Sequence, residues 1–191
     1  KQGRIAADHI CGRRSAYTGA LGTSVLKLFD LTAASTGLNE KQARAAGVAY
    51  DKVVTYSASH ASYYPGARNM TVKTLFDPAS GRILGAQIVG FDGVDKRMDV
   101  LAAAIRAGLT AEQLTELDLA YAPPYGSAKD PVNMAGYVIE NVRAGLVEQH
   151  HWDAVAELPA DGSVILLDVR TPGEVRKQGL LRSDALHIPL D

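Results

Sequence analysis

Two short apolar stretches joined by a tight turn constrain the fold of this chain more than any other feature. Residues 70–76 and 83–89 have the composition of β-strands, and the turn between them contains Pro78 and Gly81. Proline presets φ for a turn, and glycine accepts conformations that other residues avoid. The two stretches are therefore predicted to form an antiparallel hairpin.

Further strands and helices are expected on both sides of this hairpin. Strands are predicted at residues 23–33 and 52–57. A helix is predicted at residues 94–107, because Val94, Met98, Leu101, Ala102 and Ile105 share one face at helical spacing. Shorter helices are expected at residues 1–12, at 40–46 after an Asn39 cap, at 110–117 and at 131–144. This part of the chain is predicted to be α+β, an antiparallel sheet with helices on one side.

The sequence pattern changes after residues 145–151, where we expect a domain boundary. Residues 152–158 indicate a short helix, and residues 164–169 form a continuous apolar run, typical of a strand buried on both faces of a parallel sheet. A helix opening at Thr171 and a strand at residues 186–188 would follow. We therefore expect the beginning of a second, α/β domain. Because both ends of the sequence fall within predicted elements, the chain is expected to be a piece of a longer one.

Composition excludes several classes of protein. The net charge is −1, which gives no electrostatic case for binding nucleic acid or an anionic membrane. The apolar runs, such as residues 164–167, are far too short to span a bilayer, and no signal peptide is visible. A single cysteine rules out an internal disulfide framework and fits a reducing cytosol, so a cytoplasmic protein is expected.

Two loop segments concentrate groups that could carry chemistry. Residues 120–137 combine several tyrosines with Lys129, Asp130 and Asn133 on a segment stiffened by prolines, and residues 59–66 contain His60, Tyr63 and Tyr64 before a Pro-Gly turn. A phenol stays protonated at neutral pH and can donate a hydrogen bond to a thiolate or an oxyanion. The alternatives are structural: a proline-rich connector with packed tyrosines, and a hydrophobic turn with a solvated histidine.

Other candidate sites are weaker. Cys11 lies beside Arg13 and Arg14, which would favour a thiolate, but it lacks a second cysteine at redox spacing, so we expect a buried and inert residue at a helix end. The adjacent pair His150 and His151 has no partners at metal-ligand spacing. The glycines within residues 19–22 do not follow a strand, which argues against a nucleotide-binding loop.

Several motifs together resemble a known family. Residues 19–40, Tyr63-Tyr64-Pro65-Gly66, Gly93-Val-Asp-Lys-Arg-Met-Asp-Val100 and residues 121–133 occur in the order found in the pyridine nucleotide-disulfide reductases. The sequence is most similar to the branch of coenzyme A-disulfide reductases and NADH oxidases. By this resemblance, residues 1–15 end an FAD-binding domain and residues 16–147 form the dimerisation domain.

The resemblance implies a homodimeric enzyme that uses FAD and NAD(P)H, bound mostly by N-terminal domains, to reduce a coenzyme A disulfide, persulfide or polysulfide. It implies that Tyr63 and Tyr121 approach the redox sulfur of the partner subunit, with Tyr121 also near the flavin. Lys129 and Tyr63 would contact the coenzyme A-type substrate, and Tyr64 and Tyr125 are secondary candidates. An NADH oxidase or peroxidase of the same family, or a dimerisation module without activity, remain the alternatives.

Residues 148–191 resemble the start of a rhodanese domain. The resemblance rests on Val164-Ile-Leu-Leu-Asp-Val-Arg-Thr-Pro-Gly-Glu174 and on His187-Ile-Pro-Leu190. The stretch at residues 179–185 departs from the usual rhodanese pattern. The catalytic cysteine of a rhodanese is not present in this chain, so the resemblance implies a truncated domain.

Overall fold

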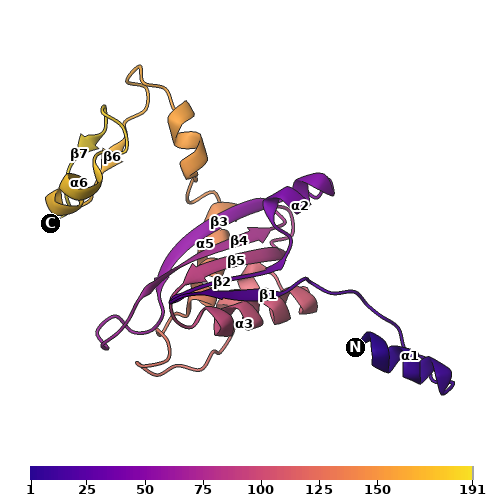
Figure 1. Ribbon diagram of the computed structural model, residues 1–191. Coiled ribbons are helices and arrows are strands. Elements are labelled where there is room, and N and C mark those ends of the chain that lie inside the picture. The colour runs from indigo at the N-terminus through magenta and orange to yellow at the C-terminus, as the bar shows by residue number, and fades with distance from the viewer. Residues whose placement is uncertain (191) are drawn as a thin grey trace. The chain divides into compact units, whose positions relative to one another are not determined.

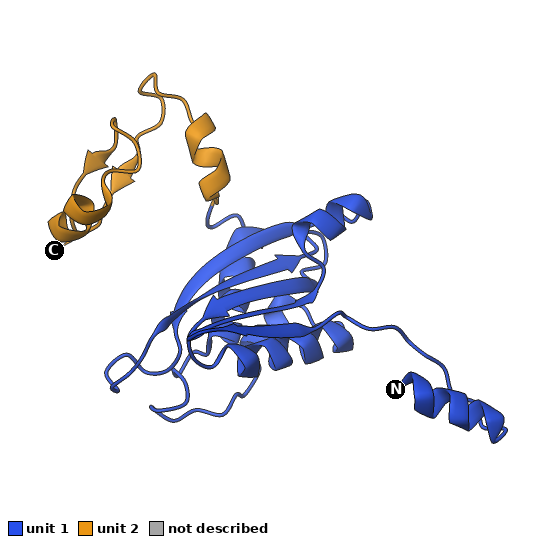
Figure 2. Ribbon diagram, viewed as in Figure 1, with its two compact units in different colours: residues 1–147 blue, residues 148–191 orange. Residues whose placement is uncertain are grey.

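A computed structural model describes residues 1–190 of the protein. It contains two compact units, residues 1–147 and residues 148–191 (Figure 2). Asp191, where the predicted second domain ends, lies outside the described residues. Within the described part of the chain, no helix is long and apolar enough to cross a membrane.

The first unit contains a five-stranded antiparallel sheet with strand order β1-β2-β5-β4-β3 (Figure 1). The strands are β1 (Ser24–Leu28), β2 (Leu31–Gly37), β3 (Asp51–Ala58), β4 (Asn69–Phe76) and β5 (Ile83–Gly90). The predicted hairpin is confirmed as β4 and β5, and in its turn the Gly81 N–H donates to the Asp77 carbonyl over 2.8 Å. The predicted antiparallel α+β class is confirmed as well.

Helices pack mainly on one face of this sheet. The unit contains α1 (Gln2–Ile10), α2 (Glu40–Ala45), α3 (Val94–Ala107), α4 (Ala111–Thr115) and α5 (Pro131–Arg143). Helix α3 packs against β2 and β5, and α5 packs against β3 (Figure 1). The core between the layers is formed by apolar side chains that are fully buried, among them Phe76, Ile83, Ile88, Met98, Leu101, Leu114 and Ile139.

Capping boxes begin α2, α4 and α5 of the first unit. The Asn39 side chain accepts from the Gln42 N–H, which confirms Asn39 as the cap of α2. The Asp130 side chain caps α5 in the same way, and Pro131 stands in its first turn, where the missing N–H costs nothing. These caps hold the ends of the connecting loops at defined positions.

The single strand predicted at residues 23–33 is wrong. The chain turns back at Phe29 and Asp30, so that β1 and β2 form a hairpin in which Leu28 pairs with Leu31. Phe29 adopts φ 51°, a region that few residues other than glycine enter. No glycine, asparagine or proline marks this turn, and both flanks have strand composition, so the break was not visible in the sequence.

The opposite face of the sheet carries a row of side chains that crosses all five strands. In register, Leu26 pairs with Ala33, Ala33 with Val89, Val89 with Thr71, and Thr71 with Tyr56. Leu26 and Tyr56 are 64% and 75% exposed. Near one end of this face, Glu40 of α2 forms ion pairs with Lys52 and Lys73. We call the row from Leu26 to Tyr56 the open row.

The second unit is a small strand–helix–strand arrangement. It contains η1 (Trp152–Glu157), β6 (Leu167–Asp168), α6 (Pro172–Gln178) and β7 (Leu186–His187), and β6 and β7 pair in parallel. Residues 164–169 were predicted to be buried on both faces, and this is wrong for the described residues, because Ile165 is 73% exposed. Leu167 is 55% exposed as well, whereas Asp168 is buried.

Candidate functional site

The two tyrosine-bearing loops lie at the same end of the sheet. One connects β3 to β4 and carries Tyr63; the other connects α4 to α5 and carries Tyr121 (Figure 1). They touch through their backbones, because the Ala61 N–H donates to the carbonyl of Gly126 over 2.9 Å and to that of Pro123 over 3.3 Å. Residues far apart in the sequence therefore share one surface.

The structure brings the hydroxyls of Tyr63 and Tyr121 together. Their oxygens lie 3.2 Å apart, although the residues are 58 positions apart in the sequence. The hydrogen bond with Tyr121, with some desolvation, raises the pKa of Tyr63 above its ordinary value of 10.0. Tyr63 is 75% exposed and Tyr121 is 49% exposed, so this pair can meet a molecule outside the unit. We call it the tyrosine pair.

The secondary candidates lie around the tyrosine pair in different roles. The Tyr64 ring meets the His60 ring edge-on, with centroids 5.9 Å apart. Tyr125 is largely exposed on the second loop. The Lys129 ammonium lies 5.1 Å from the centroid of the Tyr137 ring, a cation–π contact at the start of α5. Among the described residues, Lys129 makes no hydrogen bond to either member of the tyrosine pair.

His60 is a structural part of the first loop, and the expectation of a solvated side chain is wrong. It is 5% exposed, and its Nε2 lies 3.3 Å from the Pro65 carbonyl, which can only accept. Nε2 therefore carries the proton, and Nδ1 faces the Ser59 hydroxyl at 3.1 Å. The Ser59 oxygen also accepts from the Arg68 N–H at 3.2 Å. These bonds close the loop that presents Tyr63.

A buried arginine behind both loops was missed by the sequence analysis. Arg97 of α3 is 1% exposed and forms an ion pair with Asp130 over 2.9 Å. The sequence did contain a signal, because Arg97 lies at helical spacing on the same face as Val94, Met98 and Leu101. An arginine within the apolar face of a predicted helix indicates a buried charge with a specific partner.

The surroundings of Cys11 differ from the prediction. Cys11 ends α1 and is exposed, so the prediction of a buried cysteine is wrong. Within residues 1–190, no group of His, Cys, Asp or Glu side chains has the arrangement of a metal site.

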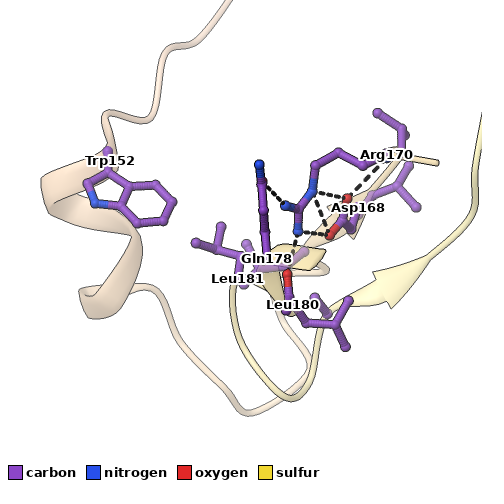
Figure 3. Close-up of a pocket in the computed structure, with 11 residues that line it drawn as sticks. Trp152, Asp168, Arg170, Gln178, Leu180 and Leu181 are labelled. Carbon is purple, nitrogen blue, oxygen red and sulfur yellow. Dashed lines mark hydrogen bonds and ion pairs between the residues drawn. The ribbon is translucent and has the colours of Figure 1, made fainter. Parts of the chain in front are cut away.

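The second unit has a hollow of about 530 Å³ beside its short sheet. Figure 3 shows the Arg170 side chain held by Asp168 and Gln178, with Trp152 and Leu181 on the apolar side of the hollow. Hydrogen bonds from Arg170 lower the pKa of Asp168 to about 2. Several apolar residues of the lining, among them Trp152 and Leu167, are exposed.

Comparisons with known proteins give a consistent result. A family model described as pyridine nucleotide-disulphide oxidoreductase, dimerisation domain, matches residues 23–131. A coenzyme A disulfide reductase of Staphylococcus haemolyticus (strain JCSC1435) is 42% identical over 134 residues, which are 70% of this chain and 30% of that protein.

Solved structures cover more of the chain. The crystal structure of reduced CoADR-RHD of Bacillus anthracis is 49% identical, with a TM-score of 0.91, over 100% of this chain and 34% of that one. A NAD-dependent persulfide reductase from A. fulgidus is 40% identical, with a TM-score of 0.85, over 98% of this chain and 33% of that one. The chain thus spans about a third of the length of the relatives that it matches.

Proposed function

Because the chain belongs to the pyridine nucleotide-disulphide oxidoreductase family through its dimerisation domain, we propose that it works within a homodimeric, FAD-dependent NAD(P)H oxidoreductase. In this proposal the chain supplies the contact between subunits and two tyrosines for the partner's reaction centre. FAD, when bound, supplies the electron transfer from NAD(P)H. By the family resemblance we assign Tyr121, which is half exposed on its loop, a place beside the flavin.

The observation that carries the proposal is the exposed, hydrogen-bonded tyrosine pair. Reducing a disulfide takes two electrons and two protons and releases two thiols. The sulfur that leaves as a thiolate is stabilised by a hydrogen bond from a protonated phenol. Because the pKa of Tyr63 is raised above its ordinary value, Tyr63 stays protonated at neutral pH and can fill this role.

The substrate class that we propose is a coenzyme A disulfide, persulfide or polysulfide. Relatives named coenzyme A disulfide reductase and persulfide reductase support this choice. We assign Lys129 to the phosphates of coenzyme A, since an ammonium is a compact charge suited to phosphate, and Tyr63 to the sulfur end of the substrate. The contact with the Tyr137 ring holds the Lys129 side chain along the surface of α5.

For the dimer contact we propose the open row on the sheet face. The open row carries the exposed apolar side chains of Leu26, Val89 and Tyr56, and such a surface is the kind that a partner subunit covers. In a two-fold dimer the same patch would serve both subunits. We expect the protein in the cytoplasm, where the reducing environment suits thiol chemistry.

For residues 148–191 we propose the beginning of a rhodanese-like domain. The strand–helix–strand arrangement and the exposed apolar side chains around the hollow support it. So does the full coverage of this chain by the CoADR-RHD structure. Such a domain would bring persulfide chemistry to the reductase.

The proposal is tested by steady-state assays of the protein together with its flavin-binding part. NADH and NADPH are compared as donors, and coenzyme A disulfide, coenzyme A persulfide and oxygen as acceptors. A Tyr63→Phe/Tyr121→Phe double variant should slow turnover of the sulfur acceptors while flavin reduction by NAD(P)H keeps its rate. The control is Tyr17→Phe, which removes a hydroxyl from the segment between α1 and β1 and should change neither rate.

Unchanged sulfur turnover in the double variant would refute the role of the tyrosine pair. Fast turnover with oxygen alone would identify an oxidase instead of a reductase. A stable dimer without turnover of any acceptor would leave the dimerisation module as the correct interpretation.

A further inference from the structure

We propose that Arg97 is the positioning residue of the tyrosine pair: its buried guanidinium ties both tyrosine-bearing loops to α3 and so sets the contact between the hydroxyls of Tyr63 and Tyr121. The geometric part of this inference concerns the chain alone. Its consequence for catalysis rests on the proposed function.

The guanidinium of Arg97 bonds to four residues that lie on three separate segments. Nε and Nη2 donate to the Asp130 carboxylate over 2.9 to 3.3 Å. Nη2 also donates to the Ser59 carbonyl over 2.9 Å and reaches the Tyr125 carbonyl at 3.5 Å. Nη1 donates to the Gly93 carbonyl over 3.2 Å. Arginine alone among side chains offers five N–H donors in a fixed plane, which suits such a set of acceptors.

Two of these acceptors lead directly to the tyrosine pair. Ser59 lies four residues before Tyr63, and its side chain helps to close the loop through His60 and the Arg68 N–H. Tyr125 lies four residues after Tyr121, in a turn where its N–H donates to the Ala122 carbonyl over 2.8 Å. One planar group therefore fixes the base of both loops.

Because Asp130 is also an acceptor of Arg97, replacing Arg97 carries a cost in stability. Asp130 is 4% exposed and also caps α5, since its Oδ1 accepts from the Val132 N–H over 3.1 Å. Removing Arg97 would leave this carboxylate buried without its cation, which is strongly destabilising. An experiment must therefore separate two roles of Arg97: neutralising the Asp130 carboxylate, which is purely structural, and positioning the two loops.

Substitution with lysine separates the two roles. Arg97→Lys keeps the positive charge beside Asp130 but cannot also reach the carbonyls of Ser59 and Tyr125 in one plane. Arg97→Met/Asp130→Asn removes both charges and keeps an asparagine, a good N-cap, before α5. Arg106→Met is the matched control, because Arg106 lies on the same helix and bonds to Thr18, away from both loops.

The readout is the ionisation of Tyr63, followed by NMR in chain labelled with ¹³Cζ-tyrosine, together with thermal melting. Both Arg97 variants should stay folded but melt below the wild-type temperature, because backbone carbonyls lose their donor. In both, the pKa of Tyr63 should fall to the value that it has in Tyr121→Phe, because the hydroxyls have moved apart. Arg106→Met should keep the raised pKa of Tyr63. If both Arg97 variants keep that raised pKa, the positioning role is refuted, and a structural role remains.

A second measurement uses the protein together with its flavin-binding part. In Arg97→Lys, kcat for the sulfur acceptor should fall about tenfold or more, the loss expected for a hydrogen bond to a charged group. Adding Arg97→Lys to the Tyr63→Phe/Tyr121→Phe variant should cause no further loss, because the residues act through one another. A further tenfold loss in the combined variant would overturn the inference while leaving the proposed function intact. If Arg97→Lys loses the contact between the Tyr63 and Tyr121 hydroxyls while turnover of the sulfur acceptor is unchanged, Arg97 is supported as the positioning residue. The same result would overturn the proposed function.

Discussion

Replacing Thr74 with valine should make the first unit more stable. Thr74 lies on β4 facing the core, is 0% exposed, and its hydroxyl has no hydrogen-bond partner. Its neighbours across the sheet are Val53 and Ala86, which offer no side-chain acceptor. Valine has nearly the same shape as threonine and suits a strand, so the substitution removes the buried hydroxyl without opening a cavity.

The size of the effect follows from the cost of burying an unpaired hydroxyl. That cost is about 1–3 kcal/mol, so Thr74→Val should raise the free energy of unfolding by about 1–2 kcal/mol. For a unit of this size, such a gain corresponds to a rise in melting temperature of roughly 2–8 °C.

The matched control is Thr36→Val on the neighbouring part of the same core face. Thr36 is 1% exposed, but its hydroxyl lies 2.7 Å from that of Thr23. The same substitution should therefore lower the free energy of unfolding by about 1 kcal/mol. Far-UV circular dichroism in urea follows the sheet of the first unit, and fluorescence of Trp152 follows the second. If Thr74→Val is destabilised as much as Thr36→Val, the reasoning about the unpaired hydroxyl is wrong.

Three further predictions concern single side chains. Burial opposes the charge of Glu40, but hydrogen bonds from Lys73 and its neighbours lower the pKa of Glu40 from 4.5 to about 2. The stability that the Glu40 carboxylate contributes above pH 4.5 is therefore lost as the pH falls towards 2. Glu40→Gln should flatten the pH dependence of the urea midpoint in this range. Gly85→Ala would place a Cβ 1.8 Å from the Leu38 carbonyl oxygen and should abolish the sheet signal in circular dichroism. The pKa of Asp168 is likewise lowered from 3.8 to about 2, so acid unfolding of the second unit, read from Trp152 fluorescence, should move to higher pH in Asp168→Asn if that unit depends on this carboxylate.

The main layers of the fold could be predicted because local chemistry specifies them. The turn with Pro78 and Gly81 and the helical spacing from Val94 to Ile105 each determine an element within a few residues. The turn at Phe29 was missed, since Asp30 is the only turn residue in it and strand composition continues on both sides. For residues 164–169, composition indicated burial, but burial depends on neighbouring elements that this unit does not contain.

The candidate site was predicted as a set of residues and not as an arrangement. Tyr63 and Tyr121 were named through the family resemblance, yet nothing in the sequence placed their hydroxyls in contact across 58 positions. His60 was expected to be solvated, because a position in a loop says nothing about which segment packs over it. The position of Arg97 on the apolar face of α3 indicated a buried charge, but its partners could not be predicted, because most of its acceptors are backbone carbonyls, which leave no trace in residue type.

The tyrosine pair has one hydroxyl proton to offer to a molecule outside the pair. Two hydroxyls 3.2 Å apart share one hydrogen bond, so one of their two protons remains for an outside acceptor. Either oxygen can donate in the shared bond, so the remaining proton is on whichever tyrosine accepts it. A phenol that accepts one hydrogen bond donates its own more strongly. An approaching anion would thus meet a single strengthened donor, supplied by whichever tyrosine accepts the shared bond.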